Sequence, residues 1–147
     1  MAFGIENLER CFHGIPAEVN RTIHICCGYP DRLDSDHYQK APSQNYFRLA
    51  PALDEAALDV ISIEDAHRHN DLFLLELFKT KTIILGVFGI ARSRIESVEE
   101  IASRLRKALD HIDKERLVAA PDCGLGILSR RQVKAKLANM VKAAQLV

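Results

Sequence analysis

Residues 82–124 read TIILGVFGIARSRIESVEEIASRLRKALDHIDKERLVAAPDCG, and they contain two short apolar runs with a helical pattern between them. The two runs are rich in β-branched and other apolar residues, which is typical of strands covered on both faces. Between them, Ile101 and Leu105 recur at the spacing of one helix face. Ser97 and Glu100 form the capping-box pattern that begins a helix. This order predicts a βαβ unit with parallel strands.

The same alternation of apolar runs and helical patterns continues toward both ends of the chain. A second capping-box pattern, Ser129 with Gln132, opens the last helical segment. We therefore expect strands at residues 22–27, 58–64, 82–90 and 116–124, and helices at residues 5–13, 44–57, 71–79, 97–112 and 129–147.

The length of the chain limits how many such units it can hold. Repeating βαβ units form (β/α)8 barrels, but a complete barrel takes roughly 250 residues, and this chain has 147. We expect an α/β fold in which residues 1–147 form a single partial domain, about half of a TIM-type barrel. Because half a barrel leaves two unpaired strand edges, we also expect a homo-oligomer or a complementing chain that supplies the missing half.

Composition argues against partners that are held by bulk charge. Twenty basic and twenty acidic residues balance, which gives no support for a nucleic-acid or membrane-surface partner. The first residues, MAFGIENLER, carry charges where a signal peptide needs an apolar core, and no run reaches transmembrane length. We expect a cytoplasmic protein. In that reducing setting, four cysteines indicate metal binding or catalysis rather than disulfides.

Residues 21–30, RTIHICCGYP, place a histidine and two cysteines at the end of the first expected strand. Since side chains alternate between the two faces of a strand, His24 and Cys26 point the same way and Cys27 points the other way. A His-x-Cys pair at the carboxyl end of a parallel strand can therefore reach one ion. A zinc site needs further ligands from other strands.

Two other strand ends carry suitable groups. The second strand finishes with Glu64, and Cys123 follows the fourth strand in the loop APDCGLG. The carboxyl ends of parallel strands share one rim, where barrel enzymes gather their functional residues. Together with His24 and Cys26, these residues would form a nitrogen, sulfur and oxygen donor set. Thiolate ligands favour zinc over magnesium or calcium.

Each of these residues also has an ordinary structural interpretation. A buried cysteine most often acts as a small apolar residue, and this is the interpretation we favour for Cys11 and Cys27. A single histidine is usually a hydrogen-bonded core residue, and Glu64 and Asp65 are typical of a helix start. Spacing alone leaves both the metal site and these alternatives open.

Four blocks of the sequence resemble a known family. They are HICCGYP (24–30), LDVISIED (58–65), GVFGIARSRIESVEEI (86–101) and RLVAAPDCGLGIL (116–128). In order and at compatible spacing, they resemble successive blocks of the cobalamin-independent methionine synthase family, in the second half of its C-terminal catalytic barrel. The resemblance covers nearly the whole chain. The H-x-C block and the PDCGL block together are specific.

The resemblance implies a zinc-dependent methyltransferase of methionine biosynthesis. It implies a zinc ion bound by the histidine and cysteine of one H-x-C motif, a glutamate and a later cysteine. These positions are His24, Cys26, Glu64 and Cys123 here. In this family the zinc binds the thiol of homocysteine, and a methyl-tetrahydrofolate donates the alkyl group. A divalent cation stabilises the thiolate, which is the nucleophile.

The sequence departs from the family at one functional motif. The family carries Asp-Ile-His after the strand that matches GVFGI, whereas this chain has Gly89 and Ala91 at the acid and histidine positions. We therefore expect methyl transfer from the folate to be slow in this chain alone. SRIESVEEI and the doubled Cys26-Cys27 look more like the short relatives of this family, which include the epoxyalkane:coenzyme M transferases. This resemblance implies an alternative, in which a zinc-bound coenzyme M thiolate opens an epoxide. Arg92 and Arg94 could then face a sulfonate or carboxylate, although solvent-facing loop arginines are the commoner case.

Two further hypotheses concern the catalytic residues and whether the chain is active alone. His67, which follows Glu64 closely, is a candidate catalytic group beside Arg92 and Arg94, and it equally fits a capped helix start. The chain could also be an inactive zinc protein, or one that requires its partner for turnover. We lean toward an enzyme, a zinc-dependent thiol methyl- or alkyltransferase.

Overall fold

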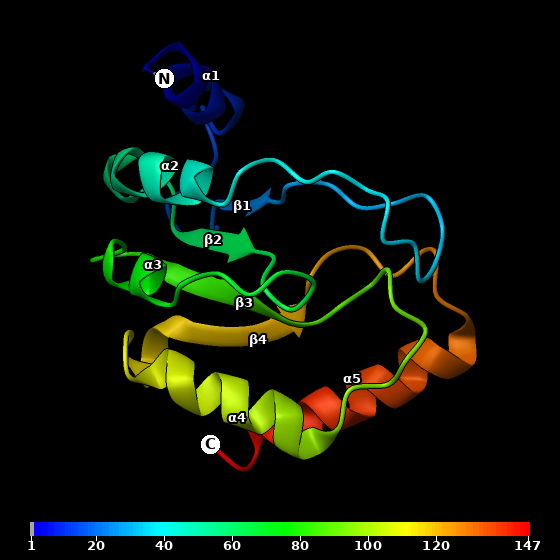
Figure 1. Ribbon diagram of the computed structural model, residues 1–147. Coiled ribbons are helices and arrows are strands. Elements are labelled where there is room, and N and C mark those ends of the chain that lie inside the picture. Colours follow the sequence, from blue (N-terminus) through cyan, green and yellow to red (C-terminus); the bar gives the residue numbers. More distant parts are fainter. Residues whose placement is uncertain (1) are drawn as a thin grey trace.

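The computed structural model describes residues 2–147 and contains one sheet of four parallel strands in the order β1-β2-β3-β4 (Figure 1). The strands are β1 (Thr22–Ile25), β2 (Val60–Ile63), β3 (Thr82–Phe88) and β4 (Leu117–Pro121). Each strand pairs with the next one along the chain, as in a barrel wall. This confirms the α/β fold with parallel βαβ units.

Helices connect the strands and flank the sheet. They are α1 (Ala2–Cys11), α2 (Gln44–Glu55), α3 (Phe73–Glu76), α4 (Val98–Leu109) and α5 (Arg130–Ala144), with a short 3-10 helix η1 (Lys114–Arg116) before β4. Both expected capping boxes are present, Ser97 with Glu100 on α4 and Ser129 with Gln132 on α5. None of the helices in residues 2–147 has the length and apolar character of a membrane span.

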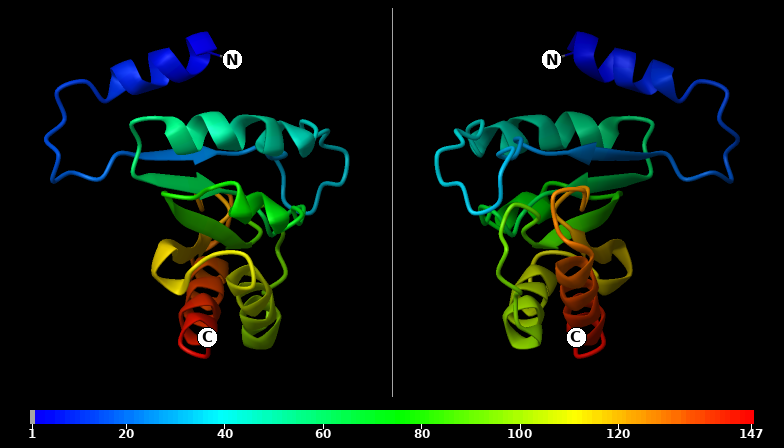
Figure 2. Two further views of the ribbon diagram at one scale, coloured as in Figure 1. Left: turned by 90° about the vertical axis from the view of Figure 1, so that its left-hand side faces the viewer. Right: turned by 90° about the vertical axis from the view of Figure 1, so that its right-hand side faces the viewer.

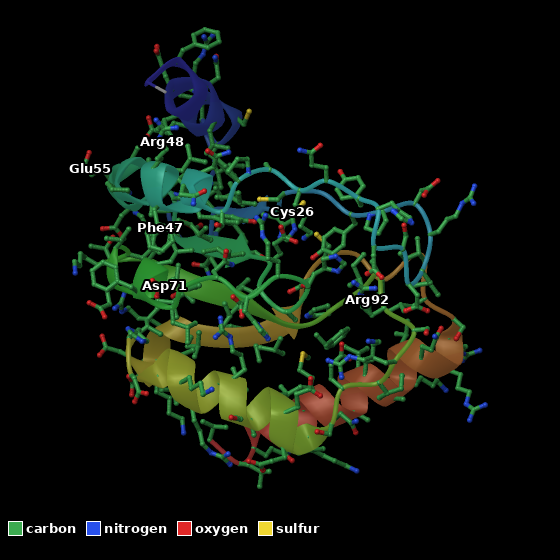
Figure 3. The ribbon with its side chains drawn as sticks, in the orientation of Figure 1. Cys26, Phe47, Arg48, Glu55, Asp71 and Arg92 are labelled. Carbon is green, nitrogen blue, oxygen red and sulfur yellow. The ribbon has the colours of Figure 1, made fainter. Side chains whose placement is uncertain are left out.

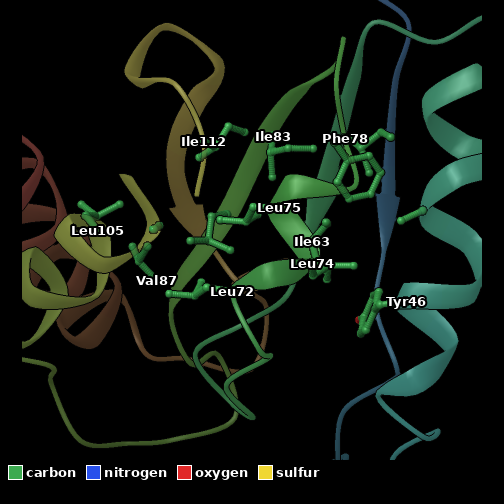
Figure 4. Close-up of a cluster of buried hydrophobic side chains, with 14 of the residues drawn as sticks. Tyr46, Ile63, Leu72, Leu74, Leu75, Phe78, Ile83, Val87, Leu105 and Ile112 are labelled. Carbon is green, nitrogen blue, oxygen red and sulfur yellow. The ribbon is translucent and has the colours of Figure 1, made fainter. Parts of the chain in front are cut away.

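The helix expected at residues 71–79 is shorter than its apolar pattern predicts. Helix α3 spans one turn, and the N–H groups of Leu77 and Phe78 bond to carbonyls three residues back, which tightens the chain. This tight turn lets Leu74, Leu75 and Phe78 all enter the core from one short connection (Figure 4). These large side chains are therefore buried from a tight turn and not from one face of a longer helix.

The two faces of the sheet differ in how well they are covered. Ile61, Ile63, Ile83 and Leu85 point toward the helices and are buried. The row on the other face is partly or fully exposed at His24, Ser62, Ile84 and Val118, which are aligned across the four strands. Coverage on both faces, expected from the apolar runs, is therefore wrong for this row. We call it the open face.

The core lies between the covered face and the helices. Ile101 and Leu105 of α4 are buried at the helical spacing that the sequence predicted, and together with Ala108 they pack in the same cluster as Ile83 and Leu85 of β3. Burying one such large side chain stabilises the fold by about 1.5–3 kcal/mol relative to leaving it exposed. Helix α1 lies over α2, beyond the sheet, at the β1 end of the molecule (Figure 2).

Candidate metal centre

Three of the four expected ligands meet at the carboxyl ends of the strands. The donor atoms of His24, Cys26 and Cys123 all lie within 4.8 Å of one another. His24 Nε2 lies 2.7 Å from Cys123 Sγ. His24 lies on β1, and Cys123 follows β4. Cys26 follows β1 directly and is labelled in Figure 3. We call these three residues the His-Cys cluster.

The cluster requires a strongly curved sheet. Strands β1 and β4 are its two edges, with β2 and β3 between them. Neighbouring strands lie about 4.8 Å apart, so the two edge backbones would be about 14 Å apart in a flat sheet. The contact between His24 and Cys123 therefore shows that the sheet curls toward its open face, as the strands of a barrel do.

The imidazole of His24 is oriented by the neighbouring strand. Its Nδ1 lies 2.9 Å from Ser62 Oγ, and Ser62 is the residue aligned with His24 on β2. A proton on Nδ1, donated to this hydroxyl, leaves the lone pair of Nε2 directed at the cysteines. Outer partners of this kind fix the tautomer and the ring orientation of a ligating histidine.

Glu64, the fourth expected ligand, lies outside the His-Cys cluster. Its carboxylate is 4% exposed and is engaged on both oxygens. Oε1 accepts hydrogen bonds from the backbone N–H of Cys27 at 2.7 Å and from the Tyr46 hydroxyl at 3.1 Å. Oε2 forms an ion pair with Lys40. Burial raises the pKa of Glu64, but the hydrogen bonds from Lys40 and from the Cys27 N–H more than offset this, and the net shift is downward.

A buried aspartate holds the rim together. Asp122 is fully buried, and its carboxylate accepts hydrogen bonds of 2.7–2.8 Å from the backbone N–H groups of Asp65, Ala66 and His67. It therefore links the end of β4 to the end of β2, across β3. Burial raises the pKa of Asp122 to about 6, although the three backbone donors oppose that shift.

Glycine at position 86 makes this crossing possible. An added Cβ on Gly86 would lie 2.0 Å from Asp122 Oδ1 and 2.8 Å from Asp122 Cα. No side chain fits at such distances, because part of the obstacle is backbone. The close packing of Asp122 on Gly86 thus fixes the position of the neighbouring Cys123 relative to the end of β2, where Glu64 lies.

The electrostatics of the His-Cys cluster suit an exchange of protons for a cation. Burial lowers the pKa of His24, so the imidazole is neutral and has a lone pair to offer; the Glu64 charge partly opposes that shift. Burial raises the pKa of Cys123 to about 12, and contact with Cys26 and the charges of Glu64 and Asp122 add to the rise. A thiol of this kind loses its proton when a cation binds.

The other two cysteines do not join the cluster. Cys27 packs against the core and receives a hydrogen bond from Arg68 at 3.4 Å on its Sγ. Cys11 lies on α1, and its thiol donates to the Asn7 carbonyl. No disulfide joins any of the cysteines, all four of which lie in the described residues. The placement of Cys27 away from Cys26 agrees with the alternation expected of the strand.

The three candidate catalytic residues lie in different surroundings. His67 packs edge-on against Tyr29, with ring centroids 5.3 Å apart, and its Nδ1 is buried without a hydrogen-bond partner. Arg92 pairs with Asp36 at 2.6 Å, and Figure 3 shows it on the loop after β3. Arg94 pairs with Glu100 at the start of α4. Both arginines therefore have carboxylate partners within the chain.

A buried ion pair occupies the region of the missing acid motif. Lys136 of α5 and Glu96 are both buried and lie 2.6 Å apart. Glu96 accepts from the N–H of Gly89 at 3.2 Å, and Lys136 donates to the Gly89 carbonyl at 3.1 Å. Ala91 is fully buried. Both backbone groups of Gly89 are thus fixed by charged side chains.

The donor set fits a zinc ion. Two sulfur donors and one imidazole nitrogen converge within 4.8 Å, and these are the ligand types that zinc prefers. The remaining position would fall to Glu64 or to a small thiol. Ser62 and Asp122 contact the residues around this donor set, Lys40 pairs with Glu64, and the sequence did not predict any of these three roles. The only local signal was for Asp122, which stands beside Cys123 in the quoted PDCGL block.

Comparison with known proteins gives consistent results over the whole chain. Residues 41–146 match the family model described as the cobalamin-independent synthase, catalytic domain. The methionine synthase of Thermococcus kodakarensis is 31% identical over 148 residues, covering 100% of this chain and 39% of that protein. The methionine synthase of Pyrococcus horikoshii is 32% identical, covering 97% of this chain and 37% of that protein. The chain thus spans about two fifths of the length of each of these relatives.

Solved structures agree with this result. The B12-independent methionine synthase of Shewanella sp. W3-18-1, solved in complex with selenomethionine, superposes with a TM-score of 0.80 and 30% identity. The match covers 99% of this chain and 42% of that one. A putative vitamin-B12 independent methionine synthase from Listeria monocytogenes superposes with a TM-score of 0.62 at 17% identity, which supports the fold alone.

Proposed function

The chain belongs to the cobalamin-independent methionine synthase family, in its catalytic domain, and on this basis we propose that it binds zinc to activate a small thiol for alkylation. The proposed ligands are His24, Cys26 and Cys123, with Glu64 as the fourth. The proposed acceptor is homocysteine, and the proposed donor is a methyl-tetrahydrofolate.

One observation carries this proposal. His24 and Cys123 come from opposite edges of the sheet, 99 positions apart in the sequence, and they still touch over the open face. Local packing of a strand does not explain such a contact, because neither residue needs the other to bury its own side chain. The convergence of an imidazole nitrogen and a thiol sulfur from opposite edges of the sheet supports a shared ion as their common partner.

The residues around the cluster support the chemistry in separate ways. A bound zinc ion would stabilise the thiolate form of the acceptor at neutral pH. Ser62 holds the imidazole of His24 in one orientation, and Asp122 holds the backbone that carries Cys123. The open face beside them leaves room for a thiol to approach.

Homocysteine is favoured as the acceptor by the family and by one relative. The Shewanella enzyme was solved with selenomethionine, the selenium analogue of the amino acid that forms when homocysteine is methylated. Donor chemistry is less complete in this chain, because Gly89 and Ala91 stand where an acid and a histidine are expected. We therefore propose thiol activation as the intrinsic property and expect slow folate-dependent turnover.

Thiol binding can be measured without turnover. Purified protein should bind about one zinc per chain, and saturating homocysteine should change the zinc K-edge X-ray absorption spectrum as a sulfur ligand joins the metal. Coenzyme M, tested in parallel, separates the epoxide-opening alternative from the methionine synthase reaction. Zinc that binds but keeps the same spectrum with both thiols would indicate a purely structural metal site.

Partner binding is the second part of the proposal. We propose that residues 1–147 form one partial-barrel unit, whose open face and edge strands β1 and β4 are covered by a complementing half or by a second copy. An apolar groove of about 500 Å³, lined by residues such as Phe3, Leu8 and Ile23, runs beside the β1 edge. Val118 on β4 is 45% exposed. Exposed strand edges of this kind readily pair with other chains.

Sedimentation measures this assembly directly. At micromolar concentration we expect a species of at least twice the 16.5 kDa chain mass, or complex formation with a co-expressed complementing half. A sharp monomer mass together with a cooperative thermal transition would contradict the expectation, because it would mean that the open face is stable in water.

A further inference from the structure

Lys40 is the charged residue that pairs with Glu64, the expected fourth ligand. It comes from the loop between β1 and α2, and its ammonium group forms an ion pair with Glu64 Oε2. The two side chains are only 7% and 4% exposed. Because this ion pair is well shielded from water, it is a strong interaction. It occupies Oε2, the carboxylate oxygen that would otherwise be available to a metal ion.

The hydrogen bonds of Glu64 show which partner has to leave if a metal binds. Oε1 is held by the backbone N–H of Cys27 and by the hydroxyl of Tyr46, a buried residue of α2. These donors belong to the folded core. Oε2 is held by Lys40 alone among the hydrogen bonds of the described residues. A cation that takes Glu64 as a ligand therefore has to displace Lys40.

Lys40 has a second favourable contact that survives this displacement. Its Nζ lies 4.3 Å from the centroid of the Tyr29 ring, which is a cation–π geometry. A lysine that moves off Glu64 and keeps this contact retains one favourable partner for its ammonium group. Tyr29 is thus the group nearest to hand for Lys40 once the carboxylate has been released.

We propose that Lys40 competes with the metal ion for Glu64 and thereby sets the metal affinity of the site. In this proposal, which rests on the proposed zinc site, His24, Cys26 and Cys123 form the permanent donors and Glu64 is the exchangeable one. When Lys40 holds Glu64 in about nine molecules of ten, the apparent zinc affinity falls about tenfold.

A simple charge effect has to be separated from this competition. Lys40, Arg92 and Arg68 each lower the pKa of His67, secondary to its burial, so several cations act on this region. Any of them would repel a divalent ion at long range. Competition for Glu64 differs because it needs the carboxylate. The effect of removing Lys40 should therefore disappear once Glu64 is neutral.

The test is a double-mutant cycle read out as zinc affinity. Apo protein of the wild type, Lys40→Met, Glu64→Gln and the double variant is titrated with zinc against a chromophoric chelator at fixed pH. We expect Lys40→Met to raise the affinity about tenfold in the wild-type background, and to leave it nearly unchanged in the Glu64→Gln background. Lys40→Arg keeps the charge and should bind zinc like the wild type.

The possible outcomes distinguish the two proposals. A wild type that binds no zinc would overturn both the metal site and the role of Lys40. Two other outcomes would overturn the role of Lys40 only. One is zinc binding with equal affinity in the wild type and in Lys40→Met. The other is an equal gain in zinc affinity from Lys40→Met in the wild-type and Glu64→Gln backgrounds. Lys40→Gln is a second neutral variant, should Lys40→Met fail to fold.

Discussion

Replacing Cys123 by serine is expected to lower the zinc affinity at least a hundredfold. The hydroxyl of serine is a poor ligand for zinc, and the cluster loses one of its two sulfur donors. Loss of a mere outer partner already weakens metal sites by about 10–100-fold, so loss of a ligand should exceed that range. Cys26→Ser should have the same effect. Both are measured by chelator competition on the apo proteins.

Cys27 offers a matched control one residue away. Cys27→Ser makes the same chemical change next to Cys26, but the Cys27 side chain packs against the core and lies outside the cluster. Its zinc affinity should stay near that of the wild type. If all three serine variants lost zinc equally, the cluster would not be the binding site. The unfolding midpoints of the apo variants show whether any of them is simply misfolded.

Gly86→Ala is expected to cost at least about 3 kcal/mol in the free energy of unfolding. The new Cβ would lie 2.0 Å from Asp122 Oδ1 and 2.8 Å from its Cα. Relief requires β3 and β4 to separate or the Asp122 carboxylate to leave its three backbone donors. Each hydrogen bond to a charged group is itself worth about 1.5–3 kcal/mol. Urea unfolding of metal-free protein measures the loss.

The control for this prediction is the next glycine along the same segment. An added Cβ on Gly89 meets its nearest neighbour, Arg92 Cγ, at an ordinary 3.7 Å. Gly89→Ala should therefore change the free energy of unfolding by no more than about 0.5 kcal/mol. Equal destabilisation by both substitutions would mean that the contact between Gly86 and Asp122 does not hold the rim together.

The fold was largely predictable because its signals are local. The apolar runs are short, and the helix expected at residues 97–112 follows from the spacing of Ile101 and Leu105 together with the Ser97 and Glu100 capping box; the structure has it as Val98–Leu109. Adjacent strands in the sequence are also adjacent in the sheet, which is what repeated βαβ units imply. No knowledge of distant residues was needed for these assignments.

The part of the fold that was wrong depends on tertiary context. The pattern of residues 71–79 is helical, yet Leu74, Leu75 and Phe78 enter the core together and shorten α3 to one turn. The strands were expected to be covered on both faces, whereas Val118 and its row on the open face are not buried. Apolar content does not reveal which face lacks a partner.

Site prediction from sequence was limited in the same way. The alternation of a strand was sufficient to place His24 and Cys26 on one side and Cys27 on the other. Ser62 and Lys40 could not be found, because their roles depend on the register between two strands and on the path of a long loop. The Lys40 ion pair with Glu64 links residues 24 positions apart and follows no periodic pattern.

The linear order of the strands has a consequence for biosynthesis. Because β1, β2, β3 and β4 pair strictly in the order in which they are translated, the growing chain can extend the sheet one strand at a time, from its N-terminal end. His24 emerges early, whereas Cys123 emerges only after β4 has been synthesised. The complete His-Cys cluster therefore cannot form on a nascent chain that does not yet contain β4. In the proposed zinc site, an ion that arrives before β4 has been added meets only His24 and Cys26.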